Sequence, residues 1–171
     1  MQEGELDKAI ERYRTSIERF PNFFRAYQNI GYALVQKGDY AGAKPMLIEA
    51  IEIGGGNGTL YGLLGYCFLN TGDASFALDS YRQALLFQPD SKDWLLGKLN
   101  SLLDTGMTQE AIGMLSDMIE KDPSNANFWM MQANAFMGES DYEKAIANLE
   151  LLDRMGGNSS RSLALLGDLL L

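Results

Sequence analysis

The sequence offers few side chains that could perform catalytic chemistry. It contains no histidine, which removes the commonest general base and the commonest metal-binding side chain. The single cysteine, Cys67, lies beside Phe68 in a predicted helix and has no histidine to act as its base. We interpret it as a small buried apolar residue rather than a nucleophile. We therefore predict no catalytic residue, no metal site and no cofactor.

Two other features suggest chemistry only by their composition. The glycine-rich run at residues 54–58 lacks the preceding strand and the lysine followed by serine or threonine that a phosphate-binding loop requires. It coincides with a predicted turn, so we interpret it as a flexible connector. Most carboxylates mark predicted helix starts, where the helix dipole favours negative charge, as at Asp39, Asp73 and Asp141.

Charge and composition narrow the class of partner. The 171 residues carry 14 Lys and Arg against 23 Asp and Glu, a net charge of -9. Nucleic-acid phosphates and anionic lipids therefore have no basic surface to bind, and no segment has the length and apolarity needed to insert into a membrane. We expect a soluble protein. Its compartment, cytoplasm or periplasm, stays open, because a single cysteine does not report the redox environment.

The elements that must position any functional side chain repeat every 34 residues. One column of the repeat is alanine throughout, at Ala9, Ala43, Ala77, Ala111 and Ala145. A second column contains only the helix-stopping residues Pro21, Gly55, Pro89, Pro123 and Gly157. A third column marks a turn, at Gly4, Gly38, Gly72, Gly106 and Ser140. Each repeat is therefore predicted to hold two helices joined by a short turn.

Apolar residues between these stops follow helical spacing. The first helix of the first complete repeat carries Tyr27, Ile30, Gly31 and Leu34 at i, i+3, i+4 and i+7. The second helices alternate small and large residues, which is what a tight antiparallel pair requires. One face of each helix is thus predicted to be buried.

These columns resemble the tetratricopeptide repeat, and residues 58–89 match its signature best, with Tyr61, Leu64-Gly65, Phe68, Ala77, Tyr81, Ala84 and Pro89. The resemblance implies an all-α fold, a right-handed α-solenoid (superhelix) of antiparallel helix pairs. It also implies a single array over residues 1–171. The complete repeats would be residues 24–55, 58–89, 92–123 and 126–157, with part-repeats at 5–20 and 160–171.

The two part-repeats carry a further expectation. Residues 5–20 form a second helix without its first, and residues 160–171 form a first helix without its second. Natural arrays usually end in caps with a polar outer face, so we expect the chain to be cut from a longer array. Uncapped apolar ends would also allow a homodimer through the terminal helices.

The resemblance further implies that the first helices line a concave groove. Helical phase assigns to the groove the face opposite the buried one. The predicted protein- or peptide-binding residues are Arg25, Gln28, Asn29, Tyr32, Gln36, Tyr66, Asn70, Asn100, Asp104, Asn127, Met130, Met131 and Asn134, and Asp93 and Leu96 share their face. Within this set, one column, Tyr32, Tyr66, Asn100 and Asn134, is predicted to form a ladder. Its asparagines can pair with the backbone of an extended peptide. The alternative is ordinary polar surface.

The favoured hypothesis is a scaffold or adaptor segment for protein–protein interaction that performs no catalysis. A second hypothesis is the substrate-recruiting arm of a larger enzyme, a glycosyltransferase or a protease, whose catalytic domain lies outside these residues. A third is a structural oligomerising element of a cell-envelope assembly, associating through Leu166 and Leu170 in the last helix.

Overall fold

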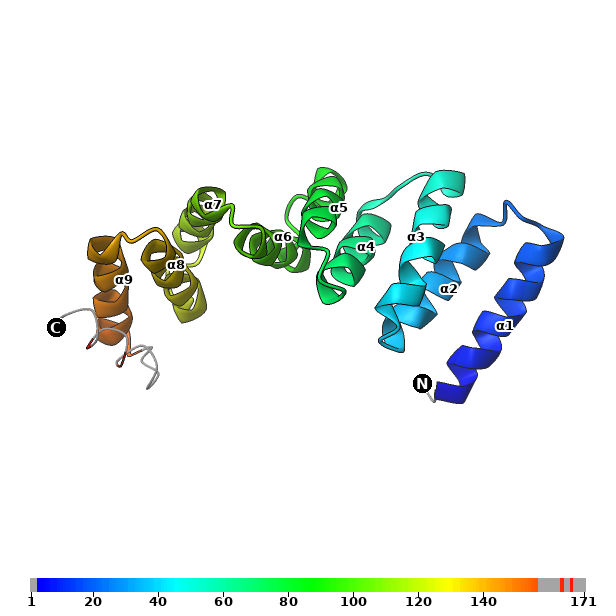
Figure 1. Ribbon diagram of the computed structural model, residues 1–171, viewed down its shortest axis with the longest axis horizontal. Helices are drawn as coiled ribbons and strands as arrows, with labels where there is room; N and C mark the ends of the chain where they lie inside the picture. Colours follow the sequence, from blue (N-terminus) through cyan, green and yellow to red (C-terminus); the bar gives the residue numbers. More distant parts are fainter. Residues whose placement is uncertain (1–2, 157–163, 165–166, 168–171) are drawn as a thin grey trace. The chain divides into compact units, whose positions relative to one another are not determined.

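The computed structural model describes residues 3–156, 164 and 167, and every regular element in this part of the chain is an α-helix (Figure 1). The nine helices described are α1 (Glu3–Arg19), α2 (Phe24–Gln36), α3 (Tyr40–Gly54), α4 (Gly58–Asn70), α5 (Ala74–Phe87), α6 (Lys92–Asp104), α7 (Thr108–Lys121), α8 (Ala126–Gly138) and α9 (Tyr142–Arg154). Consecutive helices pack antiparallel, so the predicted all-α class of antiparallel helix pairs is confirmed. The chain divides into two compact units, Met1–Ser101 and Leu102–Leu171.

The turn inside each helix pair has one backbone conformation. Its central residue has a positive φ in every pair, with Gly38 at 76°, Gly72 at 83°, Gly106 at 73° and Ser140 at 61°. The next residue donates its N–H to the carbonyl five residues earlier, as Asp39 does to Leu34 at 2.9 Å and Asp141 to Phe136 at 2.9 Å. This is the Schellman ending, which favours glycine at the left-handed position. At Gly38, Gly72, Gly106 and Ser140 the predicted turn column therefore reflects a steric requirement. The prediction was wrong at Gly4, which lies within α1.

The predicted alanine column forms the contact surface of the second helices. Ala43, Ala77, Ala111 and Ala145 have no exposed surface, and Ala9 is partly buried. On the first helix of the pair α2 and α3, Ile30 and Leu34 are buried as predicted. A side chain at Gly31 would place its Cβ 2.7 Å from Leu47, which is closer than carbon atoms can approach. Small residues on both helices thus permit their close packing.

Neighbouring pairs in the first unit are joined by polar contacts at the turns. Lys37, in the turn after α2, forms an ion pair with Asp7 of α1. Lys44 of α3 lies 2.8 Å from Asp73, in the turn before α5, and also donates to Thr71. The hydrogen bond from Lys44 holds the pKa of Asp73 below its ordinary value. These contacts fix the second helix of one repeat to the turn of the next.

The second unit contains a buried polar cluster where the first unit is apolar. Gln132 of α8 occupies the repeat position of Ile30 and Leu64, and it is buried like them. Its Nε2 donates to Ser116 Oγ of α7 at 2.8 Å, and Asn148 Nδ2 of α9 donates to Gln132 Oε1 at 2.9 Å. Hydrogen bonds therefore link side chains of three helices. The apolar residues at the equivalent position of earlier repeats, Ile30 and Leu64, did not predict these hydrogen bonds.

The first helix, α1, has a polar outer face. The outward side chains of α1 include the exposed residues Lys8, Glu11, Arg12 and Thr15, so its free face is strongly polar. Leu166 and Leu170, proposed above for association, lie outside the described residues. No helix in the described part of the chain is long and apolar enough to cross a bilayer.

Replacing Ser140 by glycine is expected to stabilise the second unit. Serine at a φ of 61° carries the steric cost of the left-handed region, which glycine avoids. After subtraction of glycine's larger entropy loss, we expect Ser140→Gly to raise the free energy of unfolding by about 0.5 kcal/mol. Urea denaturation followed by circular dichroism measures the change. Gly72→Ala is the converse control and should lower stability; an unfolding midpoint unchanged in both variants would contradict the assignment.

The polar cluster makes a non-additive prediction. Gln132→Leu leaves the Asn148 amide buried without its acceptor, which costs about 1–3 kcal/mol. The double variant Gln132→Leu, Asn148→Leu removes both groups and is expected to recover most of that loss. Denaturation of the two single variants and the double variant completes a double-mutant cycle. Additive losses would show that the hydrogen bond between the two side chains contributes nothing.

Candidate functional site

A hollow with a volume of about 380 Å³ lies on the first unit, between α4 and α6. It is lined mainly by apolar side chains, with a few polar groups among them. The lining residues are Val35 of α2, Leu63, Tyr66 and Leu69 of α4, Tyr81 of α5, and Asp93, Trp94, Leu96, Gly97 and Asn100 of α6. Ligand-binding pockets in proteins share this combination of apolar walls and sparse polar groups.

Aromatic rings packed against glycines build part of the hollow. The Tyr81 ring rests between Gly65 and Gly97, where an added Cβ would lie 3.0 Å and 2.2 Å from ring atoms, respectively. The Trp94 ring packs on Gly62, whose Cβ would lie 2.3 Å from it. The two rings stand 6.2 Å apart between centroids. The absence of side chains on α4 and α6 at these points thus makes room for two large rings.

Hydrogen bonding and burial hold these two rings in place. Trp94 Nε1 donates to Gln88 Oε1 at 2.7 Å, which ties α6 to the end of α5. Tyr81 is only 2% exposed, and this burial raises the pKa of its hydroxyl well above the ordinary value. The hydroxyl therefore stays protonated at neutral pH and keeps its capacity to donate a hydrogen bond.

Tyr66, Asp93, Leu96 and Asn100 provide the accessible part of the lining. Tyr66 is 40% exposed, and its ring meets the edge of Tyr40 at 5.4 Å between centroids. Asp93, Leu96 and Asn100 are exposed on α6. Of the predicted binding residues, Tyr66 and Asn100 line the hollow, as do Asp93 and Leu96, which were predicted to share their face.

The remaining predicted residues of the first unit lie elsewhere. Gln28 Nε2 donates to the Tyr32 hydroxyl at 2.7 Å, and both side chains are partly buried on α2. Asn70 donates its amide to the Tyr66 carbonyl at 2.8 Å and so caps its own helix. Arg25 and Gln36 are exposed, whereas Asn29 is partly buried. None of these residues is among those that line the hollow.

The predicted binding residues of the second unit are described relative to that unit only. Asp104, Asn127 and Asn134 are exposed, and Met131 is partly buried. Met130 packs against the core formed with Leu149. Tyr32, Tyr66 and Asn100 belong to the first unit and Asn134 to the second, so the four-residue ladder stays a prediction.

Sequence reasoning missed the apolar lining, namely Val35, Leu63, Leu69 and Trp94. One signal was available, because α4 contains no charged residue. A helix that is apolar on most of its faces must be covered by protein or by a partner. The prediction from helical phase assigned each position to one face of its helix and did not consider that α4 is apolar on most of its faces.

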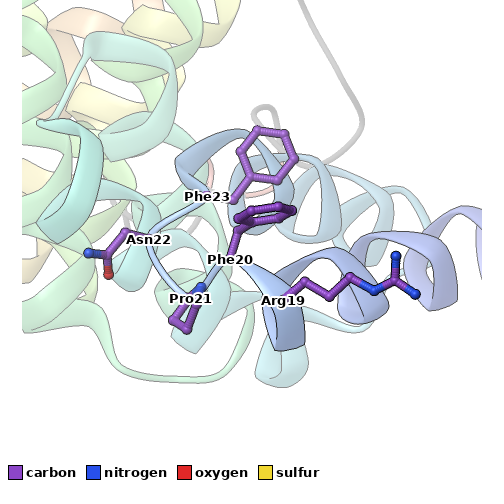
Figure 2. A pocket seen from close by; sticks show the side chains of 5 residues that line it. All are labelled: Arg19, Phe20, Pro21, Asn22 and Phe23. Atoms are coloured by element: carbon purple, nitrogen blue, oxygen red, sulfur yellow. The ribbon is translucent and has the colours of Figure 1, made fainter.

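A second hollow, of about 700 Å³, lies at the turn between α1 and α2 and is lined by Arg19, Phe20, Pro21, Asn22 and Phe23. Figure 2 shows the rings of Phe20 and Phe23 close together, with Arg19 and Asn22 pointing away from them. Phe20 is 67% exposed. Sequence reasoning missed this patch too, although two phenylalanines around Pro21 are unusual in a turn. The five lining residues come from one turn, and the polar side chains point away, so we take the α4–α6 hollow as the candidate site.

The described residues offer little for catalysis or metal binding. They contain no group of three or more acidic or cysteine side chains arranged to hold a metal ion. Cys67 is buried as predicted, and burial raises the pKa of its thiol to about 11. The thiol is therefore protonated at neutral pH and is a poor nucleophile.

Antiparallel helix pairs with one turn geometry and a common register define a helical repeat protein. Three family comparisons agree on the type of repeat. The family described as TPR repeat matches residues 1–38, and families described as tetratricopeptide repeat match residues 24–53 and 96–160. The chain belongs to the tetratricopeptide repeat family, as the resemblance in the sequence predicted.

Two curated relatives are much longer than this chain. The general transcriptional corepressor trfA of Dictyostelium discoideum is 32% identical over 90 residues, which are 53% of this chain and 6% of the relative. The BBSome complex member BBS4 of Bos taurus is 25% identical over 150 residues, which are 87% of this chain and 28% of the relative. The chain thus spans less than a third of either protein.

Solved structures share the fold. YrrB, described as a TPR protein with an unusual peptide-binding site, aligns with a TM-score of 0.83 and 24% identity over 94% of this chain and 83% of its own. MamA aligns with a TM-score of 0.76 and 17% identity over 90% of each chain. At these identities the likeness shows the tetratricopeptide-like fold alone.

Substitution of Gly97 tests the packing that builds the hollow. An alanine Cβ there would lie 2.2 Å from the buried Tyr81 ring, so we expect Gly97→Ala to lower the free energy of unfolding by about 1–3 kcal/mol. Gly113→Ala is the matched control, because Gly113 lies in α7 with open space around it. Alanine there should stabilise by about 0.5–1 kcal/mol. Thermal denaturation of both variants measures the difference, and a Gly97→Ala protein as stable as wild type would exclude this packing.

Proposed function

We propose that the chain is a protein–protein interaction segment, a scaffold or adaptor that binds a peptide or protein segment at the α4–α6 hollow and performs no catalysis. The observation that carries the proposal is the hollow itself, whose lining combines apolar side chains with Tyr66 and Asn100. Family membership supports it, since tetratricopeptide repeat proteins typically mediate protein interactions. YrrB, similar in fold, is described as having a peptide-binding site.

The lining residues suggest how a segment would bind. One large apolar side chain of the partner would enter the hollow, and its burial is worth about 1.5–3 kcal/mol. Asn100 offers both a donor and an acceptor to the partner's backbone, which adds about 0.5–1.5 kcal/mol per hydrogen bond. Such pairing needs no particular partner sequence, so the apolar side chain would provide most of the selectivity.

These magnitudes imply that the interaction extends beyond one hollow. Micromolar binding requires about 8.2 kcal/mol, which is more than one side chain and a few hydrogen bonds supply. We therefore propose that the repeats form a single array and that Tyr32, which belongs to the same unit as the hollow, extends the contact surface. The repeat boundaries predicted from the sequence are part of this proposal.

The two other hypotheses have no observation in their favour among the described residues. A recruiting arm of a glycosyltransferase or protease would depend on a domain that this chain does not include. A homodimer through the terminal helices would require an apolar end, but the described face of α1 is charged. The residues proposed for the other end are not described.

A pull-down with matched variants tests the proposed function. Tyr66→Ala combined with Asn100→Ala removes two of the three accessible polar side chains of the hollow and leaves Asp93 in place. Gln83→Ala combined with Glu120→Ala removes exposed groups outside the hollow. With all three proteins shown to have equal helicity, we expect wild type and the Gln83, Glu120 variant to capture a common partner from lysate. The Tyr66, Asn100 variant should lose at least 90% of it, roughly 1.4 kcal/mol of affinity. Equal capture by all three would show that the hollow is ordinary surface.

A further inference from the structure

The lining of the hollow carries charge of one sign only. Asp93 is the one charged residue among its lining residues, and α4, which forms the opposite wall, has none. Asp93 is exposed, and within the described part of the chain it has no ion-pair partner. A partner that brings a cation to this point gains attraction, whereas a carboxylate would be repelled.

The position of Asp93 relative to Asn100 sets a distance. Both residues lie on α6 and are seven residues apart, with Leu96 between them, and all three line the hollow. Seven residues of α-helix rise about 10.5 Å along the axis. An extended peptide advances about 3.3 Å per residue, so about three of its residues would span the distance from Asn100 to Asp93.

The size of the hollow limits what enters it. Its volume of 380 Å³ is near the lower end of the range of about 300–1,000 Å³ for ligand pockets. It therefore has room for a bulky apolar side chain of a segment whose backbone passes outside. The Tyr81 ring packed on Gly97 is one helical turn from Asn100, so the buried side chain and the backbone pairing would belong to the same partner residue.

We propose that the segment bound in the hollow is extended, with a large apolar residue held at Asn100 and a lysine or arginine about three residues away, facing Asp93. This inference rests on the proposed function. The charge complementarity selects this class over an acidic segment or a free C-terminal carboxylate. The ion pair is exposed, so it contributes selectivity rather than most of the affinity. It should weaken as salt shortens the range of the attraction.

Selection from a random dodecamer display library on the full chain tests the occupant. We expect enrichment of peptides that combine a large apolar residue with lysine or arginine about three positions away. Selection on Asp93→Asn, which keeps the size and shape of the side chain, should retain the apolar preference and lose the basic one. Enrichment of acidic residues at that spacing, or an unchanged basic preference on Asp93→Asn, would overturn the proposal.

Fluorescence polarisation with the most enriched peptide then measures how much the ion pair between Asp93 and the basic residue of the peptide contributes to binding. Replacing its basic residue by glutamine should weaken binding to wild type about two- to fivefold at 0.1 M salt. The same replacement should have no effect on Asp93→Asn, and the difference should vanish near 1 M salt. A peptide whose glutamine version binds wild type equally well would refute the pairing.

The Tyr66→Ala, Asn100→Ala variant separates failure of this inference from failure of the proposed function. If selected peptides lose binding to that variant but not to Asp93→Asn, the hollow binds segments and the proposed charge pairing is wrong. If they bind that variant as well as wild type, or if no peptide is enriched, the proposed function at this hollow fails together with the inference.

Discussion

Alanine at one position of every second helix determines how closely the helices of a pair approach. Ala43, Ala77, Ala111 and Ala145 have no exposed surface, so a larger side chain at any of them would have to displace a neighbouring helix. Because the same contact recurs every 34 residues, the same turn can precede it each time. The other features of each unit, including the position of the first helices, depend on this close contact.

Glycine facing an aromatic ring is the second recurring contact, and it alters the interpretation of the glycine-rich run. The sequence suggested a flexible connector at residues 54–58. In the structure an added Cβ at Gly54 would lie 2.1 Å from the Phe24 ring, and one at Gly56 would lie 2.1 Å from the Tyr61 ring. These glycines are required because rings occupy the space a side chain would take. The same kind of contact, at Gly62 and Gly97, builds the hollow.

The sequence predicted more of the fold than of the site, for a physical reason. Helix pairing and turns depend on local spacing, so the columns of alanine and glycine located them correctly. The hollow depends on the volume left between side chains of several helices, which helical phase does not determine. Tyr66 and Asn100 were therefore identified, whereas Trp94 and Leu63 were missed. Gln132 was missed because its hydrogen-bond partners, the acceptor Ser116 and the donor Asn148, are each 16 residues away in the sequence.

The hollow lies where the repeat departs from its own pattern. The first helices of the two preceding repeats carry Gly31 and Gly65, but α6 has Leu99 at that position and Gly97 two residues earlier. Leu99 is fully buried, so α6 still fills the core. Gly97 brings its backbone against Tyr81, and no side chain from that position occupies the space beside Leu96 and Asn100. A first helix can therefore change the surface it presents while the alanine column and the turns keep the register.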